Sequence, residues 1–240
     1  MIKNTLFLDI ETVPVAASFE ALDDNFKEFW RKKSKYWIGD SDNINEELYA
    51  EKYEEKAGIY AEFAKVVCIS AGLLVPKDDD MHMRIKSFYG HDEKELLEEF
   101  AGLLNEHYNN PLKHKLCGHN IKEFDIPFIS RRMVINGIKL PAVLDNAGKK
   151  PWETKHLCDT MEMWKFGDYK NFTSLDLLAA VLGIESPKDD IDGSMVGKVY
   201  WETQDLERIK TYCEKDVLTT AKVYLKLNNI DYNEFFLTTK

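Results

Sequence analysis

The chain has 240 residues, of which 44% are hydrophobic and 31% are charged, a composition typical of a globular domain and not of a disordered or fibrous chain. Its 32 Lys and Arg against 42 Asp and Glu give a formal net charge of −10, which argues against a protein that coats duplex DNA through a continuous basic face. We expect neither a signal peptide nor a membrane span, because no apolar run approaches about 20 residues. The four cysteines are widely spaced without the pattern of a zinc site, which predicts a reduced, cytoplasmic compartment.

The first predicted strand covers residues 4–10 (NTLFLDI), an apolar run that begins almost at the N-terminus. Pro14 argues against its continuation as a central strand, because proline cannot donate a hydrogen bond to a neighbouring strand. Residues 16–64 change in character, with aromatic residues at helical spacing among Glu and Lys. We expect two helices here, inserted after the first strand and joined by the loop IGDSDNIN, with aromatic side chains that mainly pack the helices onto the body of the protein.

The elements after this insertion alternate between strands and helices. The predicted strands cover residues 65–75, 83–89 and 115–119. The predicted helices cover residues 93–108, 125–136 and 174–182, and a last helix runs from Thr203 or Asp205 to about residue 227. Residues 156–164 fit either a strand or a helix. This order predicts an α/β domain with a mixed sheet, and a single domain over residues 1–240 because no repeat or linker divides the chain.

Two carboxylates, Asp9 and Glu11, follow the apolar residues of the first strand. Side chains two residues apart on a strand point to the same face, so both can converge on one point. Two like charges held together are costly unless a cation joins them or one is protonated. Such a pair also arises by chance in a chain with 42 acids, so alone it favours a metal site only weakly.

Two later strings carry further acids. Tyr212 and Asp216 are four residues apart in the last predicted helix and therefore share one helical face. Asp125 follows the string CGHNIKEF at a predicted helix start, where an Asp is often only an N-cap. Each string alone is as consistent with a structural role as with a functional one.

The three strings together resemble the DEDD superfamily of 3′–5′ exonucleases. Residues 9–11 (DIE) resemble its first motif, DxE; residues 120–125 (NIKEFD) resemble the second, NxxxFD; and residues 212–216 (YCEKD) resemble the third, YxxxD. Since position 211 is threonine and position 212 is tyrosine, the chain resembles the tyrosine (DEDDy) branch. Within that branch, SLDLLAAVLGI and YCEKDVLTT are most similar to the exonuclease domain of B-family DNA polymerases.

This resemblance covers about residues 2–14 and 65–227 and leaves the insertion without a counterpart. It implies an α/β fold with an RNase H-like mixed β-sheet flanked by helices, interrupted by a helical insertion after the first strand, at about residues 16–64. No polymerase domain fits in the remaining chain. We expect the insertion to lie beside the active-site cleft, because it leaves the sheet just after Glu11.

The resemblance also implies a site with these catalytic residues: Asp9, Glu11, Asp125, Tyr212 and Asp216. The four acids would hold two divalent cations, Mg²⁺ or Mn²⁺, with Asp9 bridging both. Two such ions about 3.5–4 Å apart activate a water and neutralise charge on the departing 3′-oxygen, and oxygen ligands suit them. Tyr212 would orient the water, because a phenol with an unperturbed pKa of about 10 is a poor base at neutral pH.

Four other residues are candidates for binding the substrate. The backbone at Ile10 and Thr12 is expected to meet the terminal nucleotide. Asn120 and Phe124 are expected to shape the pocket for the strand, Phe124 by stacking or packing.

The function predicted from these residues is metal-dependent 3′–5′ hydrolysis of single-stranded DNA, with nucleic-acid 3′ ends as the partner, DNA favoured over RNA, and no membrane partner. One alternative is the same chemistry on RNA, because recognition of the 2′-hydroxyl depends on pocket geometry. Another is a non-catalytic nucleic-acid-binding module on the same fold. A module without catalysis would have no physical reason to keep four mutually repelling carboxylates on one point.

Overall fold

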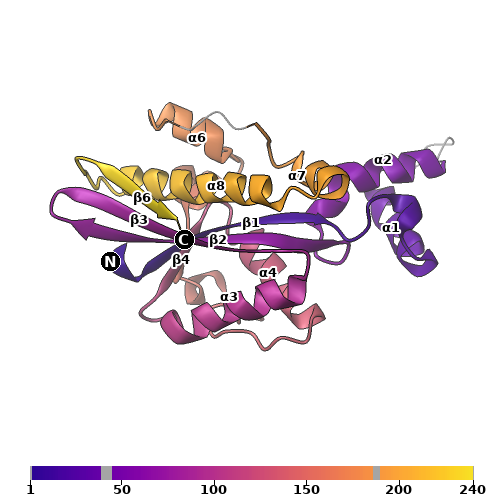
Figure 1. Cartoon of the computed structure of the whole chain (residues 1–240), viewed down its shortest axis with the longest axis horizontal. Helices are drawn as coiled ribbons and strands as arrows, with labels where there is room; N and C mark the ends of the chain where they lie inside the picture. Colours follow the sequence, from indigo (N-terminus) through magenta and orange to yellow (C-terminus); the bar gives the residue numbers. More distant parts are fainter. Residues whose placement is uncertain (1, 39–44, 186–189, 240) are drawn as a thin grey trace.

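The computed structural model describes residues 2–38, 45–185 and 190–239, and within them a six-stranded mixed sheet forms the centre of the molecule (Figure 1). The strands lie in the order β5-β4-β1-β2-β3-β6. They are β1 (Thr5–Pro14), β2 (Ala64–Lys77), β3 (Asp80–Tyr89), β4 (Lys115–Gly118), β5 (Leu157–Asp159) and β6 (Phe235–Thr239). The pairs β1–β2 and β2–β3 are antiparallel, and the pairs β1–β4, β4–β5 and β3–β6 are parallel.

Helices cover both faces of this sheet. The α-helices are α1 (Asp24–Ile38), α2 (Glu46–Lys56), α3 (Glu93–His107), α4 (Asp125–Ile135), α5 (Thr160–Lys165), α6 (Leu175–Val181), α7 (Val196–Lys198) and α8 (Leu206–Leu227). Short 3-10 turns lie at Ile2–Asn4, Phe19–Ala21, Ala57–Ile59 and Pro151–Glu153, and a π-helical turn at Val199–Thr203. In Figure 1, α3 and α4 lie on one face and α8 on the other, with α6 outside α8. Within the described ranges, no helix has both the length and the apolar character needed to cross a membrane.

The side chains of β1 alternate between the two layers. Leu6, Leu8 and Ile10 pack into the core shared with α3 and α4, whereas Phe7 packs against the residues of α8. Because successive strand residues point to opposite faces, Asp9 and Glu11 lie on the α8 face with Phe7. The two acids are therefore directed to the layer that carries the third motif.

A glycine allows α8 to approach the sheet closely. Gly72 of β2 pairs with Phe7 of β1, and a Cβ added at Gly72 would lie 2.3 Å from Cε of Met83 and 3.0 Å from Cγ1 of Val217 on α8. Only a residue without a side chain fits here unless its neighbours move. The close contact at Val217 holds the adjacent Asp216 near the sheet.

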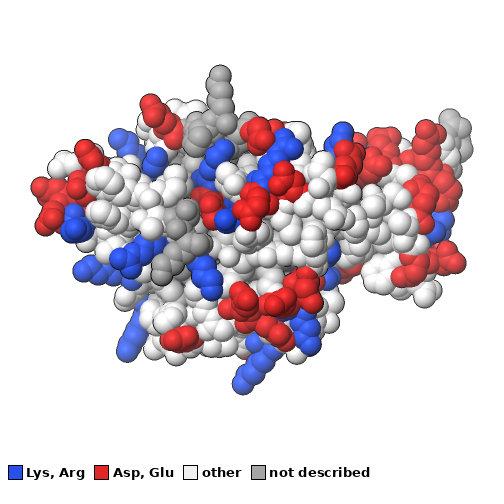
Figure 2. Space-filling model, in the orientation of Figure 1, with Lys and Arg blue, Asp and Glu red and all other residues white. Residues whose placement is uncertain are grey.

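The insertion builds a small aromatic core of its own. Trp30 is fully buried, and its ring lies 5.0 Å from that of Phe63 and 5.3 Å from that of Tyr53 in edge-to-face contacts. The helices project from the end of the sheet (Figure 1), and acidic side chains gather over α2 (Figure 2), whose sequence is EELYAEKYEEK. Arg31 of α1 forms an ion pair with Glu46 of α2 at 2.8 Å. The aromatic residues thus pack the two helices mainly against each other.

The structure differs from the sequence predictions at several boundaries. β1 continues to Pro14, four residues past the predicted end, because it pairs with β2 along this length through a bulge between Glu11 and Thr12. On its other side, within the described residues, β4 pairs only with residues 5–7, so β1 is an edge at Pro14, where proline is tolerated. β6 and α7 were not expected. The ambiguous segment contains both a strand, β5, and a helix, α5, and Asp205 is the N-cap of α8. Residues 39–44 of the predicted loop lie outside the described residues.

Candidate active site

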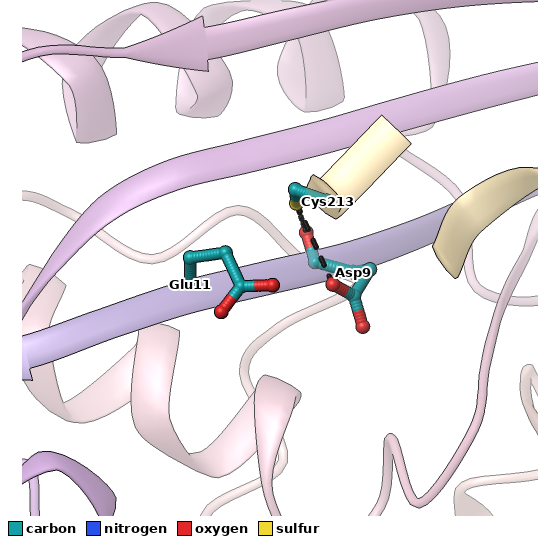
Figure 3. A group of neighbouring side chains, drawn as sticks. All are labelled: Asp9, Glu11 and Cys213. Carbon is teal, nitrogen blue, oxygen red and sulfur yellow. Dashed lines mark hydrogen bonds between the residues drawn. The ribbon is translucent and has the colours of Figure 1, made fainter. Parts of the chain in front are cut away.

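Two strand acids and a helix cysteine form the centre of the site (Figure 3). One potential ligand atom from each of Asp9, Glu11 and Cys213 lies within 4.8 Å of the other two. The thiol of Cys213 donates to the main-chain oxygen of Asp9 at 3.4 Å and to its Oδ2 at 3.5 Å. The β-strand spacing of the acids and the close approach of α8 together produce this arrangement.

Asp125 reaches the same strand from the other side. It is the first residue of α4, 3% exposed, and the N-cap position is held by Phe124 instead. Its carboxylate accepts a hydrogen bond from the backbone N–H of Ile10. Burial raises the pKa of Asp125 to about 7, with the charges of Asp159 and Asp216 adding to the rise and the backbone hydrogen bonds opposing it. The N-cap interpretation of this residue is therefore wrong: its side chain faces β1.

The third motif lies on one face of α8, as its spacing predicts. Tyr212 is half-buried, and its hydroxyl forms a hydrogen bond with the carboxylate of Asp216, one turn later. Burial raises the pKa of Tyr212 far above its usual value, and the charges of Asp216, Glu11 and Asp9 raise it further. The phenol therefore keeps its proton throughout the neutral range and serves as a donor.

The electrostatics link all four acids. Burial raises the pKa of Asp9 well above its usual value, followed by the charges of Asp216, Glu11 and Asp125. The pKa of Glu11 rises for the same reasons, with burial first and Asp216 next. Mutual repulsion of this kind is relieved by a bound cation, and hard divalent cations prefer carboxylate oxygens. The residues present fit such an ion.

Cys213 lies beside Tyr212 in the third motif and contacts Asp9. Burial raises the pKa of its thiol well above the ordinary value, and the neighbouring acids add to the rise. A protonated thiol is a poor ligand and a weak donor. Cys213 therefore supports Asp9 by a hydrogen bond, a position that follows from its place beside Tyr212 in the third motif.

Sequence reasoning missed Asp159, which organises the second motif. This residue ends β5 and is 3% exposed. Its carboxylate accepts four backbone N–H groups, from Asn120 at 3.0 Å, Lys122 at 3.2 Å, Met161 at 3.0 Å and Glu162 at 3.3 Å. The loop after β4 and the start of α5 are thereby joined, which fixes the path of the chain into Asp125. Met161 and Glu162 are local partners, because Asp159 is the N-cap of α5, whereas its contacts with Asn120 and Lys122 are formed only in the fold.

The predicted substrate residues of β1 have most of their groups engaged within the protein. The Ile10 side chain is buried in the core, so only its backbone borders the site. The Thr12 hydroxyl donates to the main-chain oxygen of Gly58 at 2.7 Å. Thr12 thus ties β1 to the end of the insertion, and a contact of its backbone with a nucleotide stays a prediction.

The residues of the second motif border the site through a sharp turn. Asn120 has φ of +62°, a left-handed conformation that Asn adopts more readily than most residues, and its main-chain oxygen accepts from Phe124 N at 3.0 Å. The Phe124 ring is partly buried and lies 5.5 Å from that of Phe128. Packing against Phe128 accounts for the buried part of the Phe124 ring. A stacking contact of this ring with a base stays a prediction.

Comparison with known families assigns residues 59–233 to a family described as predicted 3′–5′ exonucleases related to the exonuclease domain of PolB. The chain belongs to this family. The matched residues contain the second and third motifs, whereas Asp9 and Glu11 precede them. The resemblance derived from the three motifs is thereby confirmed at the level of the family.

Among solved structures, the chain is similar to the family B DNA polymerase from the hyperthermophilic archaeon Pyrobaculum calidifontis, with a TM-score of 0.58 and 16% sequence identity. The similarity covers 93% of this chain and 24% of the polymerase chain, so the exonuclease-family chain spans about a quarter of that protein. No curated protein matches the chain. The similarity shows the fold and confirms the expected RNase H-like mixed sheet flanked by helices. The two helices expected after the first strand are present in the structure as α1 and α2.

Proposed function

We propose that this exonuclease-family chain is a metal-dependent 3′–5′ exonuclease that hydrolyses phosphodiester bonds at the 3′ end of single-stranded DNA. The observation that carries the proposal is that Asp9 and Glu11 of the first motif have ligand atoms within 4.8 Å of each other and of Cys213 in the third motif. The charges of Asp125 and Asp216 also raise the pKa of both acids. A fold gains no stability from gathering buried like charges. Binding of cations and a phosphodiester would account for the gathering of these acids.

The acids take different roles in this proposal. Asp9, Glu11, Asp125 and Asp216 would together hold the cations, with Asp9 as the ligand that the family resemblance implies is shared between them. When bound, two Mg²⁺ or Mn²⁺ ions supply an activated water and stabilise the leaving 3′-oxygen. Asp125 is held in its ligand position by the backbone of Ile10. Cys213 orients Asp9 through its thiol hydrogen bond.

Tyr212 orients the attacking water in the proposed mechanism. Its raised pKa excludes a role as general base at neutral pH, because the phenolate is not populated. The hydroxyl instead forms a hydrogen bond with Asp216 and keeps a lone pair for a water. Catalysis through this group is therefore a matter of position rather than of proton transfer.

The wider assignments belong to the same proposal. Residues 1–240 form one exonuclease domain, and the substrate is held by the backbone at Ile10 and Thr12 and by Asn120 and Phe124. DNA is favoured over RNA. We keep a cytoplasmic location, predicted from the spacing of the cysteines, as part of this proposal.

Digestion of matched 5′-labelled single strands of DNA and RNA tests the proposal. With Mg²⁺ or Mn²⁺ added, we expect a descending ladder on DNA and a weaker one on RNA, and no ladder in excess EDTA. A ladder on RNA alone would replace DNA by RNA as the substrate. Binding of either strand without hydrolysis under any metal condition would favour the non-catalytic module, and hydrolysis in EDTA would refute the role of the metals.

A further inference from the structure

The segment between α5 and α6, residues 165–172 (KFGDYKNF), carries an unusual set of exposed aromatic side chains, and we call it the aromatic loop. Phe166 is 85% exposed, Tyr169 89% and Phe172 65%. Single exposed apolar residues are ordinary, but large apolar side chains gathered on one surface mark a binding site. Three aromatic rings within seven residues thus call for a partner with flat apolar faces.

Cations lie among these rings. The Lys165 ammonium lies 4.1 Å from the centre of the Phe172 ring, and Lys170 follows Tyr169. The single acid, Asp168, accepts the backbone N–H of Lys170 at 3.0 Å. The loop therefore has a net positive charge in a chain whose net charge is −10. Alternating aromatic and basic side chains fit a polymer with planar bases and an anionic backbone.

The backbone holds the first of these rings outward. Phe166 has φ of +44° and ψ of +34°, the left-handed region that is unfavourable for a bulky residue. Burial of the Phe166 ring does not compensate for this conformation, because the ring is exposed. Unfavourable backbone conformations of this kind persist where the surrounding structure imposes them and often belong to binding sites. Here the conformation ends α5 and directs Phe166 into solvent.

The aromatic loop is fastened to the second motif. His119, which directly precedes Asn120, donates its Nε2–H to the main-chain oxygen of Thr173 at 2.8 Å, and its Nδ1 lies 2.9 Å from the Thr160 hydroxyl. Burial lowers the pKa of His119, and the Thr160 hydroxyl donates to the main-chain oxygen of Gly118 at 3.3 Å. The end of the aromatic loop is thus connected through one side chain to the turn that leads into Asp125.

We propose that the aromatic loop is a stacking platform for single-stranded nucleic acid, which holds the nucleotides upstream of the 3′ end while that end occupies the carboxylate site. This inference rests on the proposed function and extends it by naming the surface on which the strand lies. Phe166, Tyr169 and Phe172 stack on bases, and Lys165 and Lys170 contact phosphates. Stacking is tolerant of sequence, because every base has a π-face.

The test compares a triple variant, Phe166→Ala with Tyr169→Ala and Phe172→Ala, with the control Tyr36→Ala. Tyr36 is 90% exposed on α1, so the control removes an equally exposed ring elsewhere. We expect the KM for long oligo(dT) to rise at least about fivefold in the triple variant, the loss of one stacked base, with the melting temperature kept. Hydrolysis of a small p-nitrophenyl ester of thymidine 5′-monophosphate, which is too short to reach the loop, should be unchanged.

Binding of fluorescent oligo(dT) and oligo(U) in EDTA separates this inference from the proposed function. If the wild type hydrolyses neither substrate, the proposed function fails, yet weaker oligonucleotide binding in the triple variant than in Tyr36→Ala still supports the platform. Tryptophan at position 169, in Tyr169→Trp, should restore part of the affinity in the background of the other two substitutions. Equal oligonucleotide affinity in the triple variant and the control would overturn the inference. A protein would then be the remaining candidate to bind the exposed rings.

Discussion

Helix α4 carries charged groups at two places, and the two surroundings are opposite in kind. Near its end, Arg132 is paired with Glu93 of α3 by Nε at 2.8 Å and Nη2 at 2.6 Å. The same carboxylate accepts from Val66 N at 2.8 Å and Asn136 Nδ2 at 2.9 Å. At its start, burial raises the pKa of Asp125, and the charges of Asp159 and Asp216 add to the rise.

This contrast separates a charged pair that stabilises the fold from a cluster of acids that is available for function. Glu93 has its partners within the chain, so its burial is compensated. Burial raises the pKa values of Asp9 and Glu11, and the neighbouring charges come mainly from other acids, so a proton or, as proposed, a bound cation would relieve their repulsion. Substitutions in the first region should therefore act on stability, and those in the second on activity.

The largest effect is expected from Asp9→Ala. Loss of the proposed bridging ligand should lower the rate of hydrolysis by several orders of magnitude, because water activation and leaving-group stabilisation both depend on the ions. The metal-free variant should be at least as stable as the wild type, since repulsion among the acids is relieved. Rates on a labelled single strand measure the effect, with the exposed Asp145→Ala as control. Wild-type rates in Asp9→Ala would contradict the catalytic assignment.

Glu93→Ala should show the reverse pattern. Arg132 would be left buried without its partner, which lowers the free energy of unfolding by about 3–5 kcal/mol. The control Arg31→Ala breaks an ion pair that is exposed to solvent, and should change stability by less than about 1 kcal/mol. Urea unfolding measures both. The division between the two regions fails if the specific activity of folded Glu93→Ala falls as far as that of Asp9→Ala.

Tyr212→Phe should have an intermediate effect on activity alone. Removal of one positioned hydrogen bond should slow hydrolysis by about 10- to 10³-fold, equivalent to about 1.4–4 kcal/mol in the transition state. Metal binding and stability should be kept. Tyr89 also donates to a carboxylate, that of Glu207, but outside the site, so Tyr89→Phe is the matched control. A Tyr212→Phe variant as inactive as Asp9→Ala would assign the phenol a larger role.

The smallest effect is a pH dependence of stability in the metal-free protein. The pKa of Asp125 is about 7 in the folded chain and about 3.9 in an unfolded one. The folded state thus binds the extra proton between these values, and its stability falls as the pH rises from about 4 to about 7. Calorimetry should show a smaller decline of stability with rising pH in Asp125→Asn than in the wild type. Saturating Mg²⁺ should oppose this decline in the wild type, because the ion binds the deprotonated acids. An equal decline in wild type and Asp125→Asn would contradict the pKa of this group.

Most of the helices and strands could be predicted from the sequence, because their signals are local. The apolar periodicity of α3, the N-cap at Ser174 and the run of β2 residues all act within one element. β6 could not be predicted, since its short FFLTT segment becomes a strand only by pairing with β3. The same is true of the end of β1, where pairing with β2 overrides the signal of Pro14.

The residues of the candidate site also differ in whether their signals are local in the sequence. The acids and Tyr212 were predicted from the resemblance of three short motifs to an exonuclease family. Asp159 and Cys213 were missed as supporting residues, because the Asn120 N–H that Asp159 accepts and the Asp9 oxygens that Cys213 contacts come from elements distant in sequence. Motifs in the sequence thus indicate candidate catalytic residues, and the structure adds the residues that hold these candidates in place.

Direct titration of the metal-free protein with Mn²⁺, followed by electron paramagnetic resonance, tests most directly whether the carboxylate cluster is completed by an ion. We predict saturable binding to the wild type, strong loss of binding in Asp9→Ala, and retained binding in Tyr212→Phe and Glu93→Ala. Equal Mn²⁺ affinity in the wild type and Asp9→Ala would contradict the account, because the ion would then bind somewhere other than among these acids.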